Sequence, residues 1–110
     1  MTITDLQDEE SLGLEDGVLQ EIEGLLNSPM VINNISSRNI DSVLANKYIA
    51  DLYGLLHNEF DIPNEAIYIN IRLNGYRSSL DYDGRLSLSI LDPETFETIL
   101  EFIQQKQSLA

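Results

Sequence analysis

The strongest constraint on this fold is a change in the spacing of apolar residues at Ala66. From there Ile67, Ile69, Ile71 and Leu73 occupy every second position, with polar residues and Tyr68 between them. A period of two places alternate side chains on one face of a strand. The pattern therefore predicts a strand with one buried face over residues 66–73.

Two turn signals follow this strand. Asn74-Gly75 is typical of a two-residue β-hairpin, because both residues adopt the positive φ angles of a type I′ turn. The second signal, Tyr82-Asp83-Gly84, places a glycine where a three-residue hairpin loop needs a left-handed residue. We therefore expect a three-stranded antiparallel meander, whose later strands add these residues to the apolar face: Tyr76, Ser78, Leu80, Leu86, Leu88 and Ile90.

Helices are predicted before and after the meander in the sequence. Apolar residues at helical spacing indicate an amphipathic helix over residues 15–27 and another over residues 40–58. Asp92 followed by Pro93 is a typical start for a last helix. Residues 30–39 suit a short strand or a loop, and we predict a loop. The expected class is α+β, in the order α-α-β-β-β-α, with the helices packed on one face of the meander.

Charge divides the chain into two parts. The net charge is −13, and residues 1–23 hold eight acidic side chains and no basic one. Residues 1–13 also lack hydrophobic periodicity, which predicts an acidic arm that is flexible or ordered by a partner. Residues 14–110 are expected to form a single domain.

The predicted meander carries the candidate binding site on its outward face. Its register directs Tyr68, Arg72, Arg77 and Arg85 to that side, with Arg72 opposite Arg77. This arrangement favours an acidic protein surface as the ligand: a partner, a second copy, or the chain's own arm with Asp8, Glu9 and Glu10. The alternative is an ordinary solvated surface on which Asp81 pairs with Arg85.

No residue pattern indicates catalysis, a cofactor or a metal. There is no cysteine, which excludes thiolate ligands, and His57 has no second ligand at helical spacing. The Asp81-x-Asp83-Gly84 run does not match a calcium loop, and no glycine-rich phosphate loop is present. We expect a protein that is not an enzyme, has no catalytic residue and uses neither a cofactor nor a metal.

These observations favour a non-enzymatic protein–protein interaction protein, a small structural subunit or adaptor of a larger assembly such as a phage particle. The alternative is an acidic nucleic-acid mimic that inhibits a DNA- or RNA-binding protein. The negative charge argues against direct binding of nucleic acid or of an anionic membrane. Without a signal peptide or a membrane span, the expected location is the cytoplasm, or a virion if the protein is viral.

Overall fold

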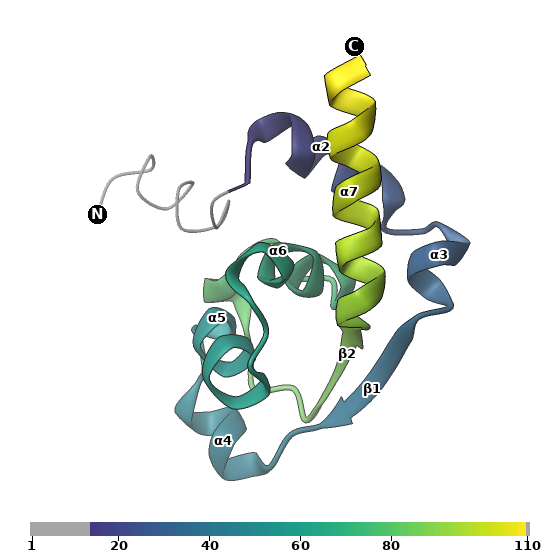
Figure 1. Cartoon of the computed structure of the whole chain (residues 1–110). Coiled ribbons are helices and arrows are strands. Elements are labelled where there is room, and N and C mark those ends of the chain that lie inside the picture. Colours follow the sequence, from purple (N-terminus) through teal and green to yellow (C-terminus); the bar gives the residue numbers. More distant parts are fainter. Residues whose placement is uncertain (1–13, 110) are drawn as a thin grey trace.

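The computed structural model describes residues 14–109, and it confirms the first and last predicted helices (Figure 1). Helix α2 spans Asp16–Leu25 and helix α7 spans Pro93–Leu109. The Asp92 carboxylate accepts a hydrogen bond from the Thr95 N–H at 3.1 Å, as expected of an N-cap. Lys106 of α7 forms an ion pair with Glu21 of α2 at 3.1 Å. None of the helices within residues 14–109 has the length and apolar character needed to cross a bilayer.

The predicted strand over residues 66–73 is wrong, because these residues form helix α6, Asn64–Leu73. Its buried residues are Ala66, Ile67, Ile69, Asn70 and Ile71. This set follows helical spacing once Asn70 is counted as a core residue. Because α6 is buried on more than one side, isoleucine can occupy every second position of the helix and still lie in the core. The alternation was therefore a consequence of a deeply buried helix.

Asn74-Gly75 ends α6 and does not form a hairpin. Gly75 has a φ of +84°, its N–H donates to the Arg72 carbonyl at 3.0 Å, and the Tyr76 N–H donates to the Ile71 carbonyl at 3.3 Å. These two bonds define a Schellman motif, in which the residue after the C-cap adopts the left-handed conformation. A glycine that tolerates positive φ serves this helix end as well as it serves a tight turn.

The sheet has two strands in the described residues, so the three-stranded meander is a wrong prediction. Strand β1 (Ile35–Asn39) pairs antiparallel with β2 (Ser87–Leu91), with Ser37 opposite Ser89. The segment predicted as a loop thus contains β1, preceded by the short helix α3 (Pro29–Ile32). Figure 1 shows β1 on the outside of the molecule and β2 between β1 and α6.

Of the remaining predicted elements, the third strand corresponds to β2, in which Leu88 and Ile90 are buried, and the others are replaced by shorter elements. The helix expected over residues 40–58 is divided into α4 (Ser42–Lys47), α5 (Leu52–Gly54) and the π-helix η1 (Leu55–Glu59). The division falls at Ala50, whose φ is +63°, and at Asp51, whose carboxylate accepts from the Gly54 N–H at 3.0 Å. The predicted second strand contains the 3₁₀ helix η2 (Ser79–Asp81). The α+β class is confirmed, and the predicted order of elements is not.

Candidate interaction site

The outer edge of β2 is covered by two asparagine side chains, one from α6 and one from its C-cap. Asn74 accepts from the Ser89 N–H at 2.7 Å and donates to the Ser89 carbonyl at 2.9 Å. One helical turn earlier, Asn70 accepts from the Leu91 N–H at 2.8 Å. These amides supply the hydrogen bonds that a third strand would otherwise make. Both asparagines are buried, so the edge of β2 is closed to other chains.

Within residues 14–109, the outer edge of β1 is open. The Ile40 N–H donates to the Leu86 carbonyl at 2.7 Å, and the Asp92 N–H donates to the Asn34 carbonyl at 2.9 Å. Because backbone groups alternate in direction along an antiparallel pair, the N–H and C=O groups of Ile35, Ser37 and Asn39 point away from β2. Within residues 14–109, no other backbone or side-chain group hydrogen-bonds to these outward groups. From Ser36 to Asn39 the strand is exposed.

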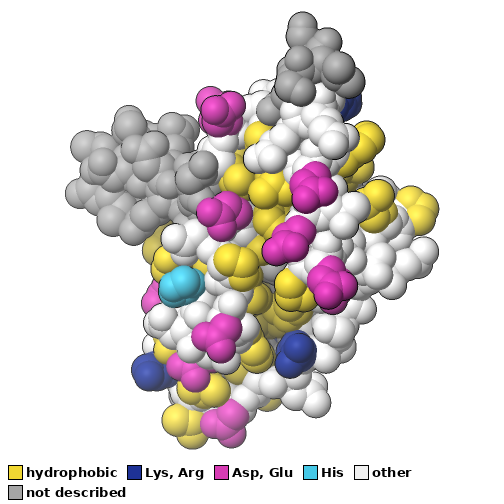
Figure 2. Space-filling view, in the orientation of Figure 1, with side chains coloured by type: hydrophobic (Ala, Val, Ile, Leu, Met, Phe, Trp, Pro, Cys, Tyr) yellow, Lys and Arg dark blue, Asp and Glu magenta, His cyan; other side chains and the backbone are white. Residues whose placement is uncertain are grey.

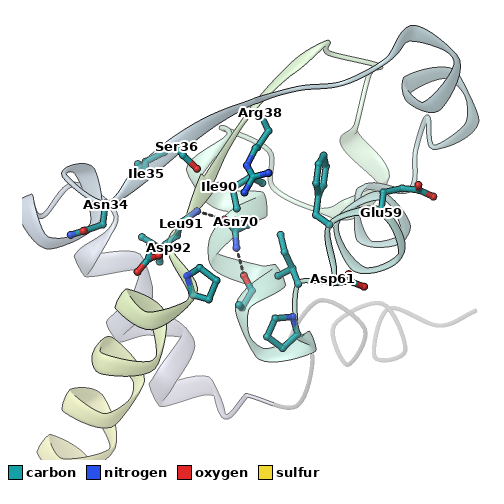
Figure 3. A pocket seen from close by; sticks show the side chains of 15 residues that line it. Asn34, Ile35, Ser36, Arg38, Glu59, Asp61, Asn70, Ile90, Leu91 and Asp92 are labelled. Atoms are coloured by element: carbon teal, nitrogen blue, oxygen red, sulfur yellow. Dashed lines mark hydrogen bonds between the residues drawn. The ribbon is translucent and has the colours of Figure 1, made fainter.

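A surface hollow of about 510 Å³ lies beside this edge. Figure 3 shows the lining side chains gathered between β1, the segment of residues 59–63, and α6. The residues that line it are Asn34, Ile35, Ser36, Arg38, Glu59, Phe60, Asp61, Ile62, Pro63, Ala66, Asn70, Ile90, Leu91, Asp92 and Pro93.

The deepest side chains of the hollow are apolar. Ile62, Ala66, Ile90 and Leu91 are buried. Asn70 is the polar side chain among them, and both ends of its amide are hydrogen-bonded: its oxygen accepts from the Leu91 N–H at 2.8 Å and its nitrogen donates to the Ala66 carbonyl at 2.7 Å. The floor of the hollow is therefore mainly apolar.

The rim of the hollow carries charged side chains of both signs. Three are carboxylates, Glu59, Asp61 and Asp92, and one is the guanidinium of Arg38, which points from β1 toward Ile90 (Figure 3). Among the described residues, neither Arg38 nor Asp61 forms an ion pair. Figure 2 shows acidic side chains scattered over this side of the molecule among apolar ones, with few basic side chains between them.

The arginine face expected from the sequence does not exist, since none of its residues lies on a strand. Arg72 and Tyr68 are one turn apart on α6, and both bind the same oxygen of Glu23 in α2. The Arg72 Nε atom is 2.8 Å from that oxygen and the Tyr68 hydroxyl is 2.9 Å from it. Burial, and then the hydrogen bond to Glu23, raise the pKa of Tyr68 to about 12. This pair joins two helices of the same chain.

Arg77 and Arg85 lie in the segment between α6 and β2. The Arg85 guanidinium donates to the Asn74 carbonyl at 2.9 Å and lies 4.8 Å from the centre of the Tyr76 ring. The side chain of Arg77 is exposed, and its guanidinium has no hydrogen-bond partner within residues 14–109. The three arginines therefore do not share a sheet face. The wrong strand assignment for α6 is the cause.

Asp8, Glu9 and Glu10, and the whole predicted arm over residues 1–13, lie outside the described residues. The sequence interpretation also missed Ile35, Ser37, Arg38 and Asn39, because it placed them in a loop. Their one sequence signal was the β-branched Ile35 next to polar residues with no proline, which is weak evidence for an edge strand.

No cluster of side chains suited to hold a metal ion occurs within the described part of the chain. No protein-family model, no curated protein and no solved structure matches the sequence or its fold.

Proposed function

We propose that the protein is a non-enzymatic interaction protein, a small subunit or adaptor that binds a protein partner in the cytoplasm or within a larger assembly. The observation that supports this proposal best is the difference between the two sheet edges. One edge is closed by buried asparagines, whereas the other leaves the outward groups of Ile35, Ser37 and Asn39 without partners among the described residues. Such an edge is a template for pairing with another chain.

The chemistry of the adjoining hollow supports binding in preference to catalysis. Its floor is apolar and its one buried polar side chain is already hydrogen-bonded. The Glu59 carboxylate accepts from the Tyr48 hydroxyl at 2.7 Å, and the Asp92 carboxylate caps α7. A binding surface needs shape, apolar area and a polar rim, and this surface provides all three.

The experiment compares two substitutions at the centre of β1 in the full-length protein. Ser37→Pro removes the outward N–H, while Ser37→Ala keeps this N–H and removes the same hydroxyl. Each variant is purified from the cells that naturally produce the protein, and the mass of its complexes is measured in solution. We expect a partner that is retained by wild type and Ser37→Ala and lost from Ser37→Pro. A wild-type protein that runs as a 12.4 kDa monomer with no partner would contradict the proposal.

A further inference from the structure

We infer that the open edge of β1 binds an extended peptide segment of a partner protein, with an apolar side chain in the hollow and basic side chains at its rim. This inference rests on the proposed interaction function and specifies its ligand. The binding mode is β-augmentation, in which the peptide becomes the third strand of the sheet.

The geometry of β1 determines how such a peptide is held. The outward N–H and C=O groups belong to alternate residues, Ile35, Ser37 and Asn39, as a strand partner requires. They need no rearrangement, because β1 is already fixed on its other side by β2. Main-chain bonds of this kind hold many sequences, so the side-chain preference must come from the hollow.

The pleat of β1 places the hollow under one face of an added strand. Ser36 and Arg38 line the hollow, as does Ile90, which is opposite Ser36 in the register. An added strand continues the same pleat, so every second side chain of the peptide faces the hollow. The apolar floor of Ile62 and Ile90 then accepts a side chain such as valine.

The charge of the rim indicates which side chains are favoured on either side of the apolar residue of the peptide. The rim has three carboxylates and one guanidinium, and the whole chain has a net charge of −13. Complementary potential favours a lysine- or arginine-bearing peptide and disfavours an acidic one. Arg38 opposes this preference locally, so removing its charge should strengthen the binding of a basic peptide.

The same charges argue against a second copy of this chain as the occupant. Two β1 strands pairing edge to edge would bring together two subunits that each carry −13, and each strand would add an exposed Arg38 to the joint face. Like charge disfavours such an association, and a charged side chain on an edge strand is a known obstacle to self-pairing.

The test uses synthetic peptides of defined sequence and the full-length protein. The probe is Thr-Lys-Thr-Val-Thr-Lys-Thr, which presents lysine, valine and lysine on one face when extended. One comparison peptide replaces both lysines by glutamate, and another replaces valine by serine. Binding is measured by titration calorimetry, and amide hydrogen exchange is measured by NMR.

We expect the basic peptide to bind with a Kd below about 1 mM, and both comparison peptides to bind at least about tenfold more weakly. The peptide should slow hydrogen exchange at the amides of Ile35, Ser37 and Asn39, whereas the amides of Ser36 and Arg38 already face β2. Ser37→Pro should abolish binding, and Ser37→Ala should preserve it.

Charge variants test the rim. Glu59→Gln with Asp61→Asn neutralises two rim carboxylates and keeps an oxygen for Tyr48, and asparagine tolerates the positive φ of +55° at position 61. We expect about a tenfold loss of affinity for the basic peptide. Glu97→Gln with Glu101→Gln makes the same charge change at exposed positions of α7 outside the hollow, and it should change affinity much less. Arg38→Gln should increase affinity.

Several results would overturn the inference. These are no binding of the basic peptide, equal binding of the acidic peptide, loss of affinity in Arg38→Gln, or a doubled mass in solution with the outward amides protected before any peptide is added. The last result would identify a second copy as the occupant. If the peptides fail while a natural partner is still lost from Ser37→Pro, the ligand chemistry is wrong and the proposed interaction function stands.

Discussion

The two outer edges of the sheet differ in what lies against their backbone N–H and C=O groups. Every edge strand leaves a row of backbone groups to be hydrogen-bonded. At β2 the side chains of Asn70 and Asn74 bind these groups inside the core, whereas at β1 the corresponding groups face outward beside a hollow. The same two-stranded sheet thus has one edge closed by side chains and one edge whose outward backbone groups have no partner within residues 14–109.

The closed edge also shows how a helix can replace a strand. Asparagines four residues apart lie on one face of α6, and their amides reach backbone groups that lie two residues apart on β2. Each amide offers both a donor and an acceptor, so a pair of them can imitate a neighbouring backbone. The helix remains continuous while the edge of the sheet is satisfied.

The largest expected effect is the loss of stability when the closed edge is opened. Asn70→Leu leaves the buried Leu91 N–H without an acceptor, which costs about 1–3 kcal/mol. Chemical denaturation with circular dichroism would measure the free energy of unfolding. Asn46→Leu, at an exposed position of α4, is the control and should change stability by less than about 0.5 kcal/mol. Equal stability of the two variants would mean that Asn70 does not close the edge.

The same asparagines explain which parts of the fold could be predicted from sequence. Helices α2 and α7 were predictable because polar residues flank a single apolar stripe and local signals mark their ends. Helix α6 was not, because its core face includes Asn70, which counts as polar in any hydrophobic pattern. Burial of Asn70 depends on β2, twenty-one residues away in the sequence, and no local pattern reports that partner.

The candidate site was harder to predict than the fold. An open edge is defined by the absence of a neighbouring strand, which is a property of the tertiary structure. Ser36 and Ser37 match no binding motif, and Arg38 was not among the three arginines predicted to form the binding face. Of the three arginines predicted to form the binding face, Arg72 and Arg85 make bonds within the chain.

An intermediate effect is expected from alkaline pH, which acts on Tyr76, two residues after Asn74 of the closed edge. Burial, and then a hydrogen bond to Asp83, raise the pKa of Tyr76 to about 12, above the ordinary value of about 10. A folded state that retains this proton is fully stabilised below pH 10 and loses that stability as the pH rises toward 12. Burial also raises the pKa of Tyr82, and Tyr68 behaves like Tyr76.

Thermal melts between pH 8 and 12 would measure this loss as a fall in Tm. Tyr76→Phe removes one of the titrating groups, so its Tm should fall less steeply above pH 10 than that of wild type. Ser37→Ala, on the open edge, should follow the wild-type curve. A Tyr76→Phe curve parallel to wild type would show that Tyr76 does not titrate with a raised pKa in the folded protein.

The smallest expected effect on stability is that of proline on the open edge. It distinguishes the backbone groups of β1 that face outward from those that face β2. The N–H that Ser37→Pro removes faces away from β2, so no hydrogen bond between the strands is lost. The hydroxyl contact to Ser87 at 3.1 Å is also lost, but it is exposed. The free energy of unfolding should therefore fall by less than about 1 kcal/mol. Ser36→Pro, one residue earlier, removes an N–H that faces β2 and should cost clearly more. Denaturation of the two variants under the same conditions makes the comparison. If both lose the same stability, the outward groups of β1 are already bonded within the folded chain, and the edge is not free to receive a partner.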